Sequence, residues 1–261
     1  MRSKALLHST YIVSMLSKEL LIAMAALSIV QTVFLSMMLP NIAVEATPYY
    51  TGGFVTPQIR LILAPVLGIT GFLYAIVTLI AAAQLGLELE RGDATIYLSH
   101  PISRSSYVLS WIIASLIIPS TMFFISLAIP LLVVEPRLLF GVSGEEMLLL
   151  VLQVLTGGFI VLAASLLFKK RSLALASGFF EYLILPLIMT IALAIFFSLV
   201  HNVTPSARDV LWLAILYPYN YLVMFNHLGA RWIEAAAANI PVLLALIVFV
   251  ILYAKRRLEV G

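Results

Sequence analysis

The sequence predicts an all-α integral membrane protein with six transmembrane helices. Hydrophobic residues make up 63% of the chain and charged residues only 10%, and the apolar residues gather in long runs. Soluble domains have about a quarter charged residues, so this chain cannot cover its surface with polar groups. No soluble domain or internal repeat is visible. We therefore expect a single transmembrane domain over residues 1–261, located in the cell membrane as a multi-pass protein.

Each predicted span is an apolar run close to or above the length of about 20 residues that crosses a bilayer. Before the first span, residues 1–19 have an amphipathic pattern that favours a helix along the membrane surface. Residues 211–228 are rich in tyrosine and contain Pro218 and Asn220, which favours short helices on or dipping into the outer leaflet over a seventh span. The predicted spans are 20–39, 59–87, 107–134, 147–168, 173–200 and 239–254.

Lysine and arginine predict the orientation, because they concentrate in cytoplasmic loops. With both termini in the cytoplasm, eleven of the 15 basic residues lie inside, and only Arg60, Arg137, Arg208 and Arg231 lie outside. The basic residues cluster at span ends and form no stripe, so we expect the lipid bilayer as a partner and no nucleic acid. Cysteine is absent and no histidine pair has metal-ligand spacing, so we expect no metal site.

The cytoplasmic link between the second and third spans is the most polar stretch between two apolar runs, "LELERGDATIYLSHPISRSSYVLSW". Gly92 can end the long second helix, and Asp93 can cap a new short helix over Ala94–His100. Pro101 stops that helix, because the residue before proline avoids the helical region. Ser103 or Ser105 can cap the third span. The order of break, cap and stop predicts a rigid short helix that projects into the cytoplasm.

The segment "ERGDATIYLSHPISR" resembles the corresponding link of ABC type-2 exporter permeases. That link commonly reads Glu-x-Gly-Thr, then about six residues, then Ser-x-Pro-(Val/Ile)-Ser-Arg. Asp93 stands where threonine is usual, and aspartate caps a helix equally well. The layout of the spans and of the aromatic outer segment is similar as well. The matching residues are Glu90, Gly92, Ser99, Pro101, Ile102, Ser103 and Arg104.

The resemblance implies that the short helix is a coupling helix, which docks in a groove of a separate ABC ATPase subunit that binds ATP and Mg. It also implies a second permease protomer, identical or different, with the first and fifth spans at the contact. This chain has no G-x-x-x-x-G-K-[ST] loop, so we expect it to bind no cofactor and to hydrolyse no ATP. The candidate coupling residues are Glu88, Glu90, Gly92, Asp93, Ser99, Pro101, Ser103 and Arg104.

Four polar residues lie deepest in the predicted spans and are candidates for a substrate path: Gln31, Gln153, Glu181 and Tyr182. The glutamines have an equally good interpretation as bridges between helices. Glu181 lies about 15 Å along its helix from Arg171. At that depth its carboxyl group must be protonated, face a wet cavity or meet a hydroxyl group. If the span starts later, Glu181 instead lies in the inner headgroup zone.

Two other function classes stay open. "GVSG" at 141–144 matches the Gly-x-Ser-Gly of rhomboid-type intramembrane proteases, and Ser143 and His227 are predicted on the same membrane side. Against a protease, rhomboids bury both residues within spans, the spacing after His227 differs, and Ser143 is equally a helix cap. The other alternative is a non-catalytic membrane scaffold.

Overall fold

The structure is a computed structural model, and it describes residues 22, 25–37, 57–99, 103–134, 136, 142–199 and 206–257. In these ranges the regular elements are all helices, as predicted. Five helical stretches are long and apolar enough to cross a membrane, which defines a membrane-embedded protein. The first predicted span is described mainly as the shorter helix Ala25–Met37. The predicted amphipathic helix over residues 1–19 lies outside the described residues.

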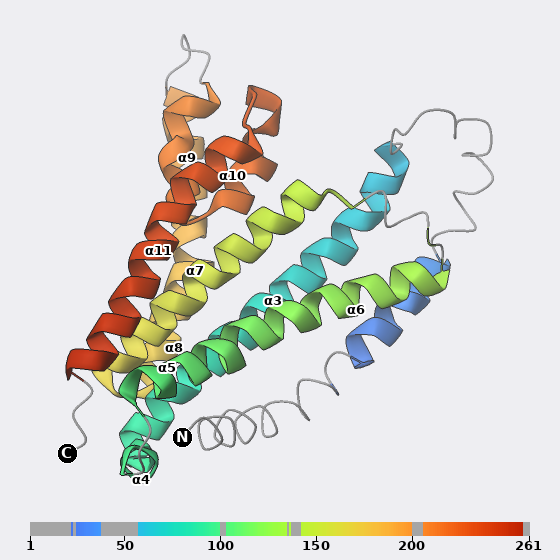
Figure 1. The fold of residues 1–261 in the computed structure, drawn as a ribbon. Coiled ribbons are helices and arrows are strands. Elements are labelled where there is room, and N and C mark those ends of the chain that lie inside the picture. Colours follow the sequence, from blue (N-terminus) through green and yellow to red (C-terminus); the bar gives the residue numbers. More distant parts are fainter. Residues whose placement is uncertain are drawn as a thin grey trace.

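The five long stretches correspond to the second to sixth predicted spans (Figure 1). The last begins earlier than predicted, because the alanine-rich turn before residue 239 continues the helix. Two of the stretches are each interrupted by a π-helical segment. The elements are α3 Pro57–Arg91, α4 Asp93–Leu98, α5 Arg104–Ile112, η1 Ile113–Ile117, α6 Ile118–Val134, α7 Gly144–Phe168, α8 Arg171–Phe179, η3 Phe180–Ile184, α9 Leu185–Leu199 and α11 Trp232–Arg257.

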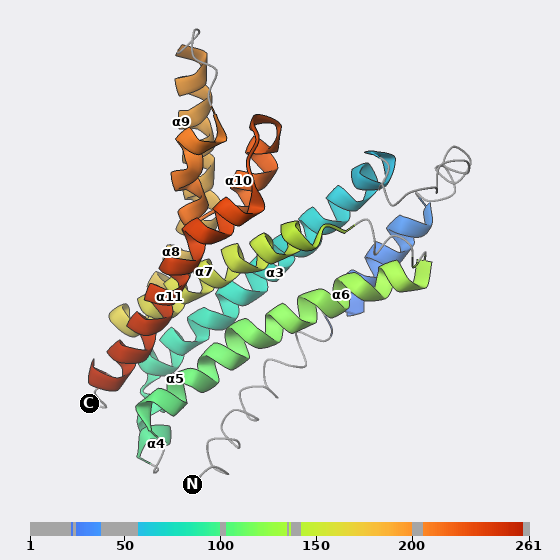
Figure 2. The same cartoon turned by 45° about the horizontal axis from the view of Figure 1, so that its top comes forward.

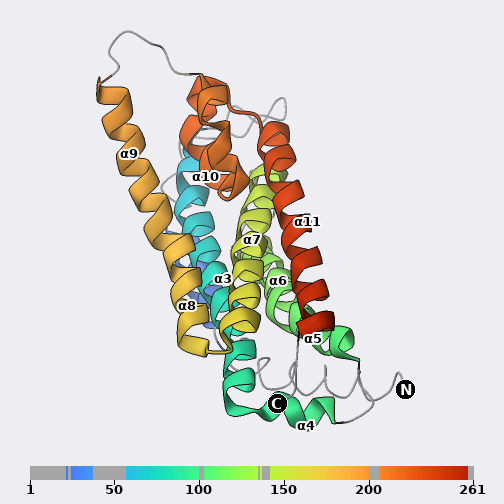
Figure 3. The same ribbon diagram turned by 90° about the vertical axis from the view of Figure 1, so that its left-hand side faces the viewer.

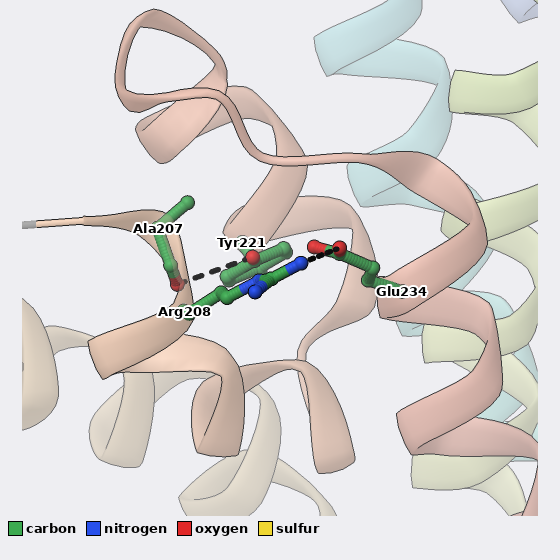
Figure 4. A network of polar contacts seen from close by, with 4 residues as sticks. All are labelled: Ala207, Arg208, Tyr221 and Glu234. Atoms are coloured by element: carbon green, nitrogen blue, oxygen red, sulfur yellow. Dashed lines mark hydrogen bonds and ion pairs between the residues drawn. The ribbon is translucent and has the colours of Figure 1, made fainter.

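The described part of the segment between α9 and α11, residues 206–231, forms short helices, as predicted, and contains no seventh span. They are η4 Ala207–Ile215, α10 Pro218–Phe225 and η5 Asn226–Leu228, called the outer helices below after their predicted side. Two contacts bind η4 to its neighbours (Figure 4): the Tyr221 hydroxyl donates to the Ala207 carbonyl at 3.2 Å, and Arg208 lies 3.8 Å from Glu234 of α11. The outer helices are therefore attached both to one another and to the last long helix.

Helix α7 is the central element of the described bundle. It lies between α3 and α11 in the view of Figure 3 and contributes residues to each of the three hydrophobic clusters, for example Leu162, Val154 and Leu149. In its most apolar window 78% of the residues are buried, against 11% for the stretch from α8 into α9. Figure 2 shows α9 and α6 leaving the bundle in different directions. The core therefore follows α7, and α9 presents most of its surface outward.

Glycines allow the helices around α7 to approach closely. A methyl group added at Gly158 would lie 2.4 Å from Leu116 Cδ2 of η1, and one added at Gly178 of α8 would lie 2.4 Å from Val161 Cγ2 of α7. Both distances are far below van der Waals contact. Small residues at helix contacts are the common means of close packing in membranes, where burial from water does not drive helices together.

Two π-helical segments were not predicted. The Ile118 amide donates to the Ile113 carbonyl and the Leu185 amide to the Phe180 carbonyl, so each segment has hydrogen bonds over five residues. Each ends two residues before a proline, Pro119 or Pro186. Proline lacks an amide hydrogen and its ring collides with the preceding turn of an α-helix. The wider π turn is a recognised way to accommodate such a break within a continuous helix.

We predict that Gly178→Ala lowers the stability of the purified protein by about 1–3 kcal/mol, because the added methyl group overlaps the rigid Val161 side chain. Gly68→Ala in α3 is the control, since nothing lies within 4 Å of the added group and alanine favours a helix. Thermal unfolding in detergent, followed by size-exclusion chromatography, measures both. An equal midpoint for the two variants would contradict the close contact of α8 with α7.

Candidate functional site

The link between α3 and α5 has the predicted break. Gly92 has a φ of 78°, in the left-handed region that favours glycine, and ends α3. Figure 3 shows α4 lying across the end of the bundle, transverse to α3. One detail differs: α4 begins at Asp93 itself and ends at Leu98, so Asp93 lies in the first turn and not before it. A carboxylate in that turn still interacts favourably with the helix dipole.

The helices on either side of α4 are joined to one another, and α4 packs against them through Ala94. On the α3 side, Glu88 Oε2 accepts a hydrogen bond of 2.5 Å from the Tyr107 hydroxyl of α5, and Ala94 of α4 is buried in the hydrophobic cluster. At the start of α5, Ser103 is the N-cap, one of the two residues predicted for this position, and accepts from the Ser106 amide at 3.1 Å. Ser99 is exposed at the end of α4, while Pro101 lies outside the described residues.

Glu90 connects the link to a different helix. Its Oε2 accepts from the Arg171 amide at 3.2 Å, and Arg171 is the first residue of α8. At the same place Gly86 lies close to the backbone of residues 170 and 171. Glu88 and Glu90 are the glutamates of the link with which Arg104 could pair. In the structure these two carboxylates bond to Tyr107 and to the start of α8 instead. Nothing local in the sequence indicates a contact across 81 positions.

The end of the bundle that carries α4 is also the basic end. It includes the start of α5, the connection between α7 and α8 and the end of α11 (Figure 3). The basic residues there are Arg91, Arg104, Lys169, Lys170, Arg171, Lys255 and Arg256. Among the described residues, the helices thus bring together the basic residues that the sequence assigned to the cytoplasmic side.

Glu181 lies in the π-helical segment η3 and is buried, with 5% of its surface exposed. Its side chain points to α7, where a methyl group added at Gly157 would lie 2.8 Å from Oε2. Among the described residues, neither carboxyl oxygen has a hydrogen-bond partner. The Tyr217 hydroxyl bonds at 2.6 Å to the backbone carbonyl of Glu181 and not to the carboxyl group. Burial and the nearby Glu181 carboxyl raise the pKa of Tyr217, which therefore remains a donor.

The other candidates for a substrate path divide into two places. Gln153 of α7 accepts from the Asn220 amide of α10 at 3.3 Å, which is the bridging role. Tyr182 follows Glu181 and packs against the hydrophobic cluster that contains Tyr74 of α3. Gln31 lies apart from Glu181 in the shorter helix and donates to Thr70 of α3. Glu181 contacts α7 at Gly157, which lies four residues after Gln153 and so on the same face of the helix. The structure thus places Gln153 and Glu181 near one face of α7.

Asn239 of α11 belongs to the same polar region and was not among the predicted site residues. Its Nδ2 donates to the Ile215 carbonyl at 2.8 Å and to Thr156 Oγ1 of α7 at 3.1 Å. Asn239 is fully buried. In the sequence, Asn239 is the first residue of the predicted span 239–254, a position at which a polar residue ordinarily marks the end of an apolar run.

A pocket lies beside this region, between α9 and the outer helices. Two of its lining residues, Tyr217 and Asn220, bond to Glu181 and Gln153. Most of the rest are apolar. The lining residues are Pro186, Met189, Thr190, Leu193, Leu213, Tyr217, Asn220, Tyr221 and Met224.

The pair considered for a protease has a different geometry. Ser143 is the N-cap of α7 and accepts from the Glu146 amide at 3.3 Å. His227 is exposed in η5, and within the described residues no hydrogen bond joins the two. Nor do those residues contain a group of histidine and acidic side chains able to hold a metal ion.

Comparisons of the chain with models of protein families, with curated proteins and with solved structures give no match. The class of the protein, a helical membrane protein, rests on its five long apolar helices. The resemblance of the link to ABC type-2 permeases rests on its residues and stays a prediction.

We predict that Glu90→Ala increases hydrogen exchange at the first amides of α8, because it removes the acceptor for the Arg171 amide. Loss of such a cap costs about 1 kcal/mol, or about a fivefold rise in local opening. Glu90→Gln keeps an acceptor oxygen and is the control. Exchange mass spectrometry of a peptide that begins before residue 169 and covers the first turn of α8 measures the effect. Equal exchange in the wild type and both variants would show that Glu90 does not hold α8.

Proposed function

We propose that the chain is the transmembrane permease subunit of an ABC transporter, working as an exporter with a separate ATPase subunit. The observation that carries the proposal is the position and anchoring of α4. It is a short helix across the basic end of the bundle: Gly92 separates it from α3, Ala94 is buried in the hydrophobic cluster, and the bond between Glu88 and Tyr107 joins α3 to α5 beside it. A partner that pushes on such a helix moves the long helices with it.

The contacts supply two routes from α4 into the bundle. One follows α3, which packs along α7 through residues such as Leu79 and Leu162. The other passes through Glu90 to the first turn of α8. Movement of α4 would thus reach α7 and the stretch that carries Glu181. A loop that served only to place positive charge in the cytoplasm would need neither connection.

In the proposed topology the α4 end faces the cytoplasm and the outer helices η4, α10 and η5 face the opposite side. Its support is the grouping of basic residues at the α4 end, together with the preference of lysine and arginine for cytoplasmic loops. Both termini would then be cytoplasmic, and a second permease protomer would complete the transporter.

Extraction in mild detergent tests the proposal directly. If the chain is a permease, an ABC ATPase subunit purifies with it, and the complex hydrolyses ATP in the presence of Mg²⁺. A preparation that contains only this chain after extraction from its native membrane, with no ATP hydrolysis, would contradict the proposal.

We predict that Gly92→Leu reduces the ATP hydrolysis rate of that complex several-fold. A side chain at a positive φ costs about 1–2 kcal/mol, and relief of the strain would turn α4 away from its docking position. Gly229→Leu is the matched control, because Gly229 has a φ of 84° and equally open surroundings but lies next to the outer helices. Equal ATP hydrolysis rates for the two variants would exclude α4 as the element that transmits movement between the ATPase and the long helices.

The topology gives a second prediction. The chain has no cysteine, so single cysteines can replace the exposed residues Lys170 and Arg231. In intact cells we expect an impermeant thiol reagent to label position 231 only, and in inverted vesicles position 170 only. The reverse pattern, or labelling of both from one side, would contradict the proposed orientation.

A further inference from the structure

We propose that Glu181 is a proton-binding site inside the membrane, and that the bound proton maintains the contact between η3 and α7. The ligand is a single proton, which the carboxyl group takes from solvent and returns to it when this contact opens. The site rests on the structure of this chain alone and goes beyond the proposed function.

The carboxyl group of Glu181 lies in closed surroundings. Only 5% of the residue is exposed, and among the described residues neither oxygen has a donor. Oε2 faces the backbone of α7, where a methyl group added at Gly157 would lie 2.8 Å from it. An ionised carboxylate can only accept hydrogen bonds, and its charge is costly in a membrane interior unless a partner or water compensates it. Such surroundings therefore favour the neutral acid.

The neighbouring polar groups are engaged elsewhere. The Tyr217 hydroxyl donates to the backbone carbonyl of Glu181 at 2.6 Å and so is not a donor to the carboxyl group. The pocket between α9 and the outer helices is not lined by Glu181, and it has room for only about one water molecule. Of a proton, a wet cavity and a hydroxyl partner, the contacts of the described residues favour the proton.

No counter-charge faces Glu181 from the described helices around it. Helix α7 faces it with Gly157, α9 contains no titratable residue, and the only one in α8, Arg171, lies about 15 Å away along the helix. The remaining titratable side chains are tyrosines, which are uncharged near neutral pH. They are Tyr182 on η3 and Tyr217 before α10, with Tyr74 of α3 and Tyr219 of α10 facing Tyr182.

The same carboxyl group is the deepest contact of its stretch with the bundle. Glu181 is the only buried residue of η3, and among the described side chains no residue from 182 to 195 is buried. Ionisation would place an uncompensated charge at this one buried position, against the backbone of Gly157. The carboxylate would then need water, which it reaches only if η3 separates from α7. The proton and the contact are therefore linked.

The linkage has a definite sign. When the contact is open to water, the carboxyl group titrates as an ordinary glutamate, at about pH 4.3. Above that pH, opening breaks the O–H bond and releases the proton to solvent. The ratio of closed to open contact then falls by up to tenfold for each pH unit, until the closed form itself loses its proton. The contact is thus stable in acid and weakens as the pH rises.

Infrared spectroscopy of the purified full-length chain in detergent at pH 6 tests for the proton. A protonated carboxyl group has its own C=O stretching band, whereas ordinary carboxyl groups are ionised at this pH. The wild-type spectrum minus that of Glu181→Gln should contain the band of one carboxylic acid. Glu145→Gln, at an exposed acidic residue of α7, should leave the band in place. Absence of the band from the wild-type minus Glu181→Gln difference would overturn the proposal.

Thermal unfolding of the same proteins at pH 6 and pH 9 tests the linkage. The midpoint should fall more with pH in the wild type and in Glu145→Gln than in Glu181→Gln. Glu181→Met, which is neutral and apolar, should lose the pH dependence as Glu181→Gln does, and this separates loss of the titrating group from a local folding defect. Equal pH dependence in the wild type and both Glu181 variants would show that the proton does not maintain the contact.

Neither measurement requires an ATPase, so the two proposals fail separately. If no ATPase purifies with the chain but the carboxylic acid band depends on Glu181, the transporter proposal fails and the proton site stands. If an ATPase purifies and the band is absent, only the proton site fails.

Discussion

Close approach to α7 is the constraint on which the rest of the fold depends. In a bilayer, helices gain little from leaving lipid for protein, so their contacts rely on tight packing and on polar bonds. Gly157 and Gly158 lie next to one another in α7 and leave room on two sides, for Glu181 of η3 and for Leu116 of η1. The stretches that contain these two π segments therefore meet the same turn of α7, and neither could do so against a larger residue.

Side chains from one helix complete the ends of another at three places. The first four amides and last four carbonyls of a helix lack partners within it. Glu90 of α3 accepts from the first amide of α8, Gln153 of α7 accepts from the Asn220 amide in the first turn of α10, and Asn239 of α11 donates to the last carbonyl of η4. The bonds to α10 and η4 are partly buried and the bond to α8 is exposed, and each fixes a short element to a long one. Two of these three bonds add to the contacts that hold the outer helices.

The sequence predicted the elements well, because length, hydrophobicity and helix-ending residues are local properties. The spans after the first, the break at Gly92 and the Ser103 cap needed only neighbouring residues. The partners of Glu88, Glu90 and Gln153 could not be predicted, since each bond joins segments far apart in the chain. Asn239 was missed for the same reason. The depth of Glu181 in its predicted span made its burial one of the alternatives. Its unpartnered oxygens and its contact with Gly157 could not be predicted, because they depend on how three helices pack.

The π segment at Phe180–Ile184 changes how the stretch from α8 to α9 displays its side chains. A π turn contains one residue more than an α turn, and one residue corresponds to about 100° of rotation around a helix. The faces of α8 and α9 are therefore out of phase. A helical wheel drawn through residues 171–199 as one α-helix would put the residues beyond the segment on the wrong side. Insertion or deletion of a single residue here would rotate α9 about its own axis and exchange the side chains that face the outer helices for those that face lipid.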